Sequence, residues 1–456
     1  MTGALRSPAF ATAAPGMEDH YQRAGRPLNV DEMTRGLLAI LAIVLTACGT
    51  VGPKPTAESS PTRSASNASA SPGVSASPSA LPNESVATPG VGAAPPAGRW
   101  QMLPSMSTPR LDFTATRLLD GRVLMVGGRT NSFAYAPGGA PTASVELFNP
   151  TTNNFSRAAS LGVARSGHSA TLLKSGKVLV AGGDGGGFGT AEVYDPSTDS
   201  WASTGPMNTR RTDHVAVPLA DGRVLVSGGA PMTYIGFGPQ GSSASKLPAE
   251  IYDPATDSWR LAATPMFDRP VRPTATLMKD GLVLVVGGQY MDNSSDEAFE
   301  RSEIYDPRSN TWSEATPEVR AGARQFQAAV ALPNGRVLIA GGARDFQATS
   351  YASLYDPASN SWTQLPNMHE NRCAPGAAPL STGRVLVVGG GCATPEQSAS
   401  AEEFDPGASR WFPVASLPTT RGSLQLVVLA NGDVLGVGGM EQAGQPTALA
   451  ELFIPS

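Results

Sequence analysis

The sequence predicts an all-β protein made of seven copies of one unit, preceded by residues 1–97 of a different character. Of its 456 residues, 50 are Gly and 40 are Pro, the two residues that interrupt helices. Short apolar runs such as 178–181 and 283–286 are bounded by Gly turns, as buried strands are. Two adjacent glycines close such a run seven times between residues 98 and 456.

Composition excludes two classes of protein. Hydrophobic residues make up 41% of the chain, enough for a core, so a wholly disordered chain is excluded. Charged residues make up 16%, compared with about 25% in ordinary soluble domains. The net charge of −5 lacks the basic excess of a nucleic-acid-binding protein, so we expect no nucleic-acid partner.

Residues 37–47 form a long apolar run near the N-terminus. As a helix this run would rise only about 16 Å, too short for a hydrocarbon core of about 30 Å. It therefore predicts the apolar region of a signal peptide. Since Met33 by itself would open a compact signal sequence, we expect residues 1–32 to precede the true start codon.

The signal sequence ends in Leu45-Thr46-Ala47-Cys48, which resembles the lipobox of bacterial lipoproteins. The resemblance implies that Cys48 is lipidated and becomes the first residue of the mature chain. Residues 49–97 are rich in Ser, Pro and Ala and cannot form a core, which predicts a disordered tether. We expect three parts: an N-terminal extension and signal peptide over 1–48, the tether over 49–97, and a repeat domain over 98–456 on the outer side of a membrane.

Three landmarks recur in each repeat. The first is the glycine pair: Gly127-Gly128, Gly182-Gly183, Gly228-Gly229, Gly287-Gly288, Gly341-Gly342, Gly389-Gly390 and Gly438-Gly439. The second is an aromatic residue followed by an Asp-Pro-like turn: Phe148, Tyr194, Tyr252, Tyr305, Tyr355, Phe404 and the degenerate Phe453. The third is a further aromatic residue: Trp100, Phe155, Trp201, Trp259, Trp312, Trp362 and Trp411.

These landmarks, at a period of about 51 residues, resemble the kelch repeat. The resemblance covers all of residues 98–456 and implies a seven-bladed β-propeller of four-stranded blades. The third landmark begins at Trp100, before the first glycine pair, and the seventh repeat lacks its own copy. We therefore expect an N-terminal strand near Trp100 to complete the last blade and close the ring.

The spacing between landmarks predicts which face carries function. The first glycine of each pair lies six positions after the turn glycine in all seven repeats, so this turn does not vary. Between the second glycine of each pair and the following Glu position lie, in repeat order, 17, 8, 20, 14, 10, 11 and 11 residues. With strands a to d in each blade, the variable b–c and d–a connections share one face. Because binding residues concentrate in variable loops on a rigid scaffold, we predict that this face binds the partner, with 129–145 and 230–249 as its broadest loops.

An arginine recurs where strand a would begin, which predicts a ring at the channel entrance that could bind an acidic ligand. The structural alternative pairs each arginine with the recurring Glu of strand c or with loop carbonyls. The candidate ring is Arg110, Arg165, Arg211, Arg269, Arg324, Arg372 and Arg421.

Cys373 and Cys392 lie nearly opposite each other at one end of a predicted hairpin. In an oxidising compartment this arrangement predicts a disulfide, and the alternative is two free, buried thiols. His168 and His214 occupy equivalent places in adjacent repeats, where we expect packing between blades rather than a metal site.

We expect a lipid-anchored, monomeric binding module for a protein or glycan, with no cofactor and no metal; the arginine ring would suit an acidic partner. Two enzymatic alternatives stay open through resemblance to other kelch proteins. The galactose-oxidase group needs a copper site of two His, two Tyr and a Cys joined to Tyr, and no such cluster is evident here. N-acetylneuraminate epimerases of the kelch fold would use Arg and carboxylates at the channel mouth. We identify no catalytic residues and favour binding over catalysis.

Overall fold

The computed structural model describes residues 98–131, 140–229, 247–267, 272–288, 301–318, 324–344, 347–391, 397–442 and 444–456. The chain separates into two units, Met1–Ala87 and Thr88–Ser456, and every described residue belongs to the second. The described residues form strands and turns and no helix, as expected for an all-β fold. Within this part of the chain, therefore, no helix has the length and apolar character needed to cross a bilayer.

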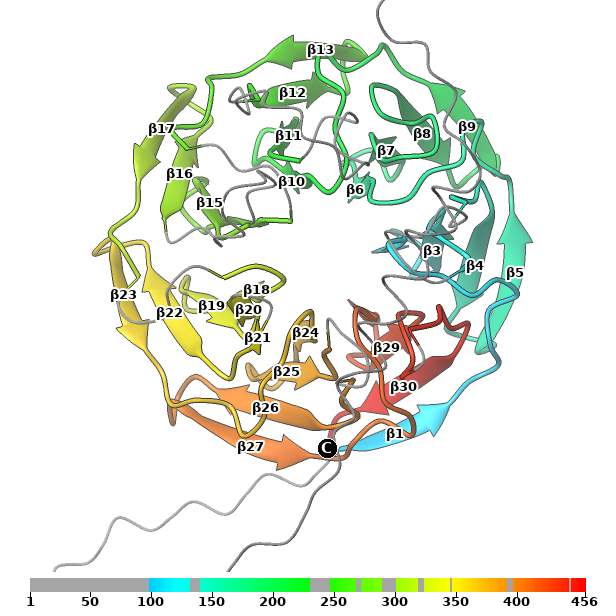
Figure 1. Ribbon diagram of the computed structural model, residues 1–456. Helices are drawn as coiled ribbons and strands as arrows, with labels where there is room; N and C mark the ends of the chain where they lie inside the picture. The colour runs from blue at the N-terminus through cyan, green and yellow to red at the C-terminus, as the bar shows by residue number, and fades with distance from the viewer. Residues whose placement is uncertain are drawn as a thin grey trace, which may run out of the picture. The chain divides into compact units, whose positions relative to one another are not determined.

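Seven four-stranded antiparallel sheets surround a central axis (Figure 1), which confirms the predicted seven-bladed propeller. In each blade we call the strands a to d from the axis outward. Blade 1 contains β2 (Thr114–Arg117), β3 (Val123–Val126), β4 (Val145–Asn149) and β5 (Asn154–Ala158). Blade 2 contains β6 (Ser169–Leu172), β7 (Val178–Ala181), β8 (Ala191–Asp195) and β9 (Ser200–Ser203). Blade 3 contains β10 (Val215–Pro218), β11 (Val224–Ser227), β12 (Glu250–Asp253) and β13 (Ser258–Leu261).

The remaining blades repeat this order. Blade 4 contains β14 (Thr274–Leu277), β15 (Val283–Val286), β16 (Ser302–Asp306) and β17 (Thr311–Glu314). Blade 5 contains β18 (Ala328–Ala331), β19 (Val337–Ala340), β22 (Ala352–Asp356) and β23 (Ser361–Gln364), with β20 (Ala343–Arg344) and β21 (Gln347–Ala348) as a small hairpin between β19 and β22. Blade 6 contains β24 (Gly376–Pro379), β25 (Val385–Val388), β26 (Ala401–Asp405) and β27 (Arg410–Val414).

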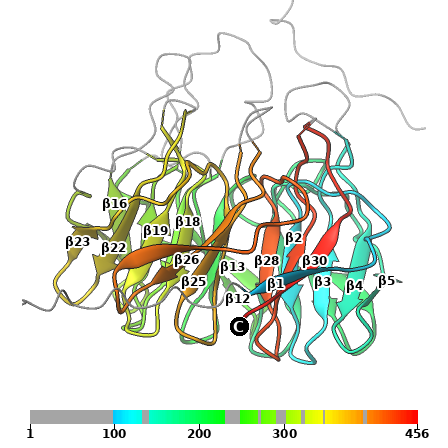
Figure 2. The ribbon, with the colours of Figure 1, turned by 90° about the horizontal axis from the view of Figure 1, so that it is seen from below.

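Blade 7 is built from both ends of the propeller. It contains β28 (Gln425–Val428), β29 (Val434–Val437), β30 (Ala450–Ile454) and β1 (Arg99–Met102), which lies beside β30 in Figures 1 and 2. Trp100 pairs with Phe453 across the two strands, with ring centroids 5.1 Å apart. The predicted closure by an N-terminal strand is confirmed.

The core lies between neighbouring blades. All four residues of strand b are buried in every blade, as their uninterrupted apolar runs require. Clusters join adjacent blades, for example Val126 of blade 1 with Val180 and Tyr194 of blade 2. The Trp201 indole Nε1 donates to the carbonyl of Ala159 in the preceding blade at 2.8 Å, so the third landmark ties one blade to the next.

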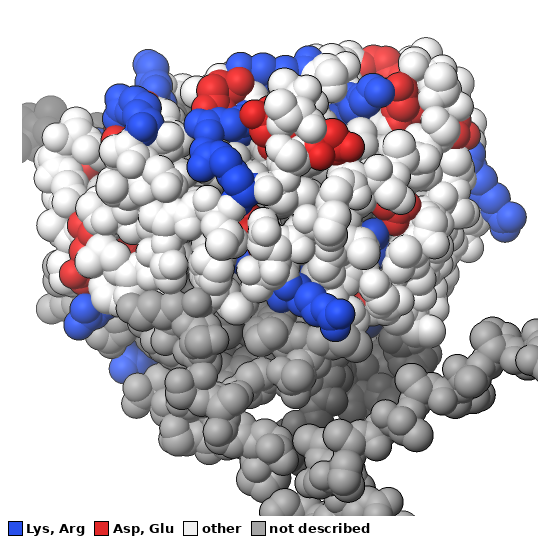
Figure 3. Space-filling view, turned by 90° about the horizontal axis from the view of Figure 1, so that it is seen from above, with Lys and Arg blue, Asp and Glu red and all other residues white. Residues whose placement is uncertain are grey.

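The propeller has two faces with different connections. The a–b and c–d turns form the turn face, and the b–c and d–a connections form the loop face. On the turn face, ion pairs join the two turns of one blade, such as Lys177 with Asp195 at 3.0 Å and Arg336 with Asp356 at 3.1 Å. Figure 3 shows the outer wall, where charged side chains gather along one edge and are sparse on the wall itself.

Candidate functional site

The recurring arginines are buried inside the blades at the loop face. The Arg211 guanidinium donates to the carbonyl of Gly228 at 2.9 Å and to the carboxylate of Glu250 at 2.8 Å. The same Glu250 carboxylate accepts the backbone N–H groups of Asn208 and Thr209 at 2.6 and 2.8 Å. One ion pair therefore joins the end of strand b, the start of strand c and the d–a connection.

Burial bears directly on the predicted arginine ring. Six of its members are described, and each has at most 2% of its surface exposed: Arg110, Arg165, Arg211, Arg324, Arg372 and Arg421. Burial lowers the pKa of Arg211 despite the opposing effect of Glu250. Burial also lowers the pKa of Arg421, to about 10, so Arg421 stays charged at neutral pH. In this conformation their guanidinium groups hold protein atoms, which favours the structural alternative over direct contact with a ligand.

Arg269 lies outside the described residues. The six other arginines each precede the first residue of strand a by four positions, as Arg211 precedes Val215. Counting back from Thr274 in blade 4 places Pro270 at that position, one residue after Arg269. The place of Arg269 in the ring therefore stays a prediction.

In blade 5 the carboxylate that pairs with the arginine comes from another place in the chain. Its strand c has Ser353 where other blades have Glu, and Arg324 instead contacts Glu318 of the d–a connection. The Ser353 hydroxyl also donates to Glu318. The charge pair is thus retained although its sequence position is not.

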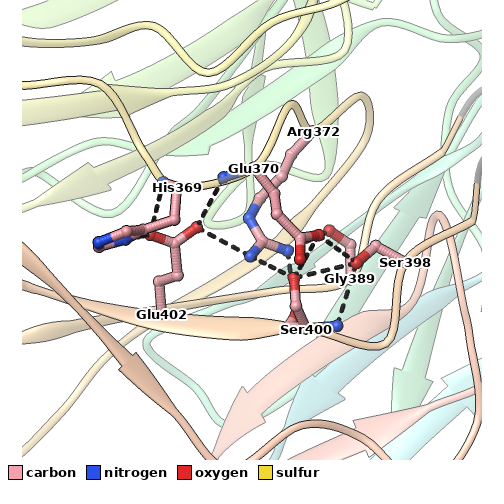
Figure 4. A network of polar contacts seen from close by, with 7 residues as sticks. All are labelled: His369, Glu370, Arg372, Gly389, Ser398, Ser400 and Glu402. Carbon is pink, nitrogen blue, oxygen red and sulfur yellow. Dashed lines mark hydrogen bonds and ion pairs between the residues drawn. The ribbon is translucent and has the colours of Figure 1, made fainter.

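Blade 6 carries a second carboxylate on the same arginine network (Figure 4). The Arg372 guanidinium donates to Glu402 at 2.9 Å and to the Ser400 hydroxyl at 2.6 Å. Ser400 and Ser398 donate to Glu370 at 2.6 and 2.7 Å. These hydrogen bonds and the charge of Arg372 lower the pKa of Glu370, although partial burial opposes them.

The cysteines are only partly described. Cys373 is buried and disulfide-bonded. Cys392 and Cys48 lie outside the described residues, so the pairing of Cys373 with Cys392 and the lipidation of Cys48 stay predictions.

A ring of left-handed backbone positions surrounds the channel mouth on the loop face. Each blade contributes the residue two positions before strand a, with φ between 49° and 62°. Backbone N–H groups link neighbouring members, for example Gly167 to the carbonyl of Asp112 at 3.0 Å and Asp213 to the carbonyl of Gly167 at 2.8 Å. We call this ring the collar: Asp112, Gly167, Asp213, Arg272, Phe326, Ala374 and Ser423.

Charged residues of the collar and the adjacent loops form a continuous series of alternating sign. Asp184 contacts Arg129 at 3.4 Å, and Arg129 contacts Asp112 at 3.3 Å. Arg272 then joins Asp112 at 3.2 Å to Asp213 at 3.0 Å. Burial is the main cause of a raised pKa at Asp213, and the positive charge of Arg272 opposes it.

The collar opens into a cavity of about 310 Å³. Below the collar, His168 and His214 line it, and their Nε2 atoms pair with the hydroxyls of Thr114 and Ser169 in the preceding blades at 3.0 and 2.9 Å. This agrees with the expected packing between blades. Burial, with neighbouring arginines, lowers the pKa of His168 to about 3 and that of His214 well below its usual range, so both imidazoles are neutral. In the described part of the chain, no three His, Cys, Asp or Glu side chains are grouped closely enough to hold a metal ion.

Comparison of the repeats missed the charged residues of the channel mouth. That comparison selects positions that stay constant, whereas the collar position holds a different residue type in most blades. Arg129 and Asp184 lie in b–c connections that differ in length. The signal that could have identified the collar was the change of residue type from repeat to repeat at one position, two residues before the otherwise regular strand a.

The geometry defines a closed β-propeller scaffold whose loop face carries a polar channel mouth. The kelch motif family model matches residues 164–208 and 326–369, in blades 2 and 5. Two of the seven blades therefore match the kelch motif, and all seven together form a β-propeller.

Curated relatives align with part of the propeller. Kelch-like protein 23 of Pongo abelii and of Homo sapiens are each 33% identical over 119 residues, 26% of this chain and 20% of the relative. A putative F-box/kelch-repeat protein of Arabidopsis thaliana is 30% identical over 87 residues, 19% of this chain and 22% of the relative. The chain therefore matches only about a fifth of the length of these relatives.

A solved structure shares the fold over a longer range. It is a fungal alcohol oxidase in complex with copper, with a TM-score of 0.64 and 19% sequence identity. The match covers 79% of this chain and 76% of that one. At this identity the likeness shows the fold alone.

Proposed function

We propose that this chain is a binding module that captures a protein or glycan partner through the loop face. One observation carries the proposal: the same buried Arg–Glu contact fixes the base of the connections in blade after blade, as Arg211 and Glu250 do in blade 3. The connections above these bases differ widely in length, from 8 to 20 residues between the glycine pair and the following Glu position. A rigid base under variable loops is the usual arrangement of a recognition surface.

Partner binding is tested with the full chain immobilised against arrays of glycans and peptides. The acidic character expected of the partner depended on arginines that are buried, so the arrays include acidic and basic ligands. Tyr351→Ala and His369→Ala change exposed loop-face side chains, and Arg308→Ala changes an exposed turn-face side chain. Loss of retention in a loop-face variant alone supports the proposal, whereas loss only in the turn-face variant contradicts it.

We also propose that a lipid on Cys48 anchors the module on the outer side of a bacterial membrane. The lipobox-like sequence and the following Ser/Pro/Ala-rich segment support this location. In a bacterial host, the wild-type chain should incorporate labelled fatty acid and sediment with membranes. Cys48→Ala should lose the label and Cys373→Ser should keep it; label retained by Cys48→Ala would overturn the anchor.

One observation favours an enzymatic alternative, namely the fold shared with the copper-containing fungal alcohol oxidase. Copper in the purified full chain, together with a radical absorption band, would support an oxidase. Mutarotation of sialic acid would support an epimerase. Retention of a partner without either activity supports the binding module.

A further inference from the structure

Among the described residues of the channel mouth, the alternating series contains more carboxylates than cations. Asp112, Asp184 and Asp213 face only Arg129 and Arg272 in the alternating series. The side chains of Asp112 and Asp213 are 11% and 18% exposed, so their charges depend on a nearby cation. Arg272 has 28% of its side chain exposed, the largest fraction in the series.

Arg272 lies across the mouth rather than beside it. It belongs to blade 4, yet its guanidinium contacts Asp213 of blade 3 and Asp112 of blade 1. Blades 2 and 3 separate blades 1 and 4 around the ring, so these contacts join distant parts of the collar. The chain's own guanidinium thus occupies the entrance of the cavity.

The opposite wall of the cavity has different chemistry. Phe326, Pro375 and Leu424 line it, and the Arg272 guanidinium lies 5.2 Å from the centre of the Phe326 ring. Gln327 lines the same cavity, is 6% exposed, and has no hydrogen-bond partner for its Oε1 atom in the described structure. The cavity therefore combines carboxylate and amide acceptors with an apolar wall.

We propose that the channel mouth binds a guanidinium or primary ammonium group carried on an aliphatic stem, and that Arg272 occupies this site in the free protein as an internal competitor. The cationic head pairs with Asp112 and Asp213, and the stem packs against Phe326 and Leu424. A basic side chain of a protein partner and a small free amine share this chemistry. The inference depends on the proposed function for its place on the partner-binding face, and it adds the chemical class of the group bound at the centre.

The test measures binding of N-acetyl-arginine amide to the full chain by titration calorimetry. Arg272→Ala removes the competitor and should bind this probe at least about tenfold more tightly than the wild-type chain. N-acetyl-citrulline amide, which has the same shape without the charge, should not bind. Adding Asp213→Asn to Arg272→Ala should abolish binding, and the turn-face variant Arg223→Ala should behave as the wild type.

A second measurement is used in case Arg272→Ala is too unstable for calorimetry. The arginine probe should raise the melting temperature of this variant in proportion to the logarithm of its concentration, since it binds only the folded state. Failure of both binding and stabilisation overturns the proposal, as does equal binding of the citrulline probe. Binding of N-acetyl-glutamate amide to the wild-type chain that is lost in Arg272→Ala would instead establish an anion site.

Two further comparisons complete the test. The first identifies the source of the bound cation, and the second distinguishes failure of this inference from failure of the proposed function. A peptide with an internal arginine that binds more tightly than 1,4-diaminobutane supports a protein side chain, and the reverse order supports a small amine. Retention of a partner that depends on Tyr351 or His369, without any binding of the arginine probe, overturns only this inference. Binding of the arginine probe by a chain whose retention of partners is lost only in the turn-face variant overturns only the loop-face proposal.

Discussion

Arg211 and Glu250 show how a buried ion pair fixes loops at the residue scale. Neither side chain is exposed, and the carboxylate accepts two backbone N–H groups besides the guanidinium. A carboxylate so surrounded is costly to leave without its cation, because no water replaces the lost contact. The pair therefore stabilises the base of the loop face.

Arg211→Ala should lower the free energy of unfolding by about 3–5 kcal/mol, because Glu250 would keep its buried charge without a partner. Arg223→Ala, which breaks the partly exposed pair with Asp221, should change it by no more than about 1 kcal/mol. Denaturant unfolding of the full chain measures both. Unchanged stability in Arg211→Ala, with loss of an acidic ligand, would restore the ligand-binding role.

His168 should make the stability depend on pH. Its pKa is about 3 in the folded chain, because burial and the nearby Arg165 and Arg110 disfavour the charged form, and about 6.5 in the unfolded chain. Between these values the unfolded chain binds a proton that the folded chain does not. Acidification below pH 6.5 therefore lowers the free energy of unfolding by up to about 1.4 kcal/mol per pH unit from this residue.

The matched variant is His168→Gln, because blade 5 has Gln327 at the equivalent position. Unfolding measured from pH 7 to pH 4 should show a shallower fall in stability for this variant than for the wild type. Both chains contain the same carboxylates, so the difference reports the imidazole alone. Equal slopes would show that His168 is protonated in the folded chain.

At the scale of the element, the glycine pair joins strand b to the next blade. Gly128 donates its N–H to the carbonyl of Arg165 at 2.8 Å, and Gly439 donates to the carbonyl of Arg110 at 3.1 Å across the closure of the ring. A Cβ atom on Gly127 would lie 2.5 Å from the carbonyl oxygen of Arg165. The pair is required because one blade's strand end approaches the backbone of its neighbour.

Gly127→Ala should therefore destabilise the propeller more than Gly121→Ala, which lies in the same hairpin. Both residues have positive φ, 59° and 89°, so both substitutions add backbone strain of about 1–2 kcal/mol. Only Gly127→Ala adds the clash with blade 2, for a total of about 2–5 kcal/mol, since nothing lies within 4 Å of a Cβ on Gly121. Thermal unfolding of the two variants measures the difference, and equal losses would contradict the blade contact.

These elements also explain what the sequence could predict. Repetition made the glycine pairs, the buried strands and the closing strand at Trp100 visible, since each blade needs the same packing. Repetition also identified the arginines, but it could not distinguish a residue that every blade needs from one that a ligand needs. The contacts of Arg272 with Asp112 and Asp213 join positions 160 and 59 residues apart, and no periodic pattern relates them.

At the scale of the whole molecule, one sheet holds the ring closed. Four residue pairs join β1 to β30, from Arg99 with Ile454 to Met102 with Glu451. The Trp100 indole adds a hydrogen bond to the carbonyl of Ala415 in the adjacent connection at 2.8 Å. Without β1, the edge of β30 would be exposed and the seventh blade incomplete.

Deleting residues 98–106 from the full chain should abolish the cooperative unfolding transition, because all seven blades depend on a closed ring. Trp100→Ala should cause a smaller loss, since it keeps the strand but removes the contact with Phe453. Differential scanning calorimetry distinguishes the two results. A deletion variant that melts at the wild-type temperature would show that closure does not require β1.

The position of β1 also determines how the molecule carries mechanical load. Residues 49–97 continue directly into this strand, so a pull along the chain from that side acts first on the four residue pairs between β1 and β30. A partner held on the loop face would transmit its tension through the same strand. If Cys48 anchors the chain as proposed, the element that closes the ring is also the first to experience force.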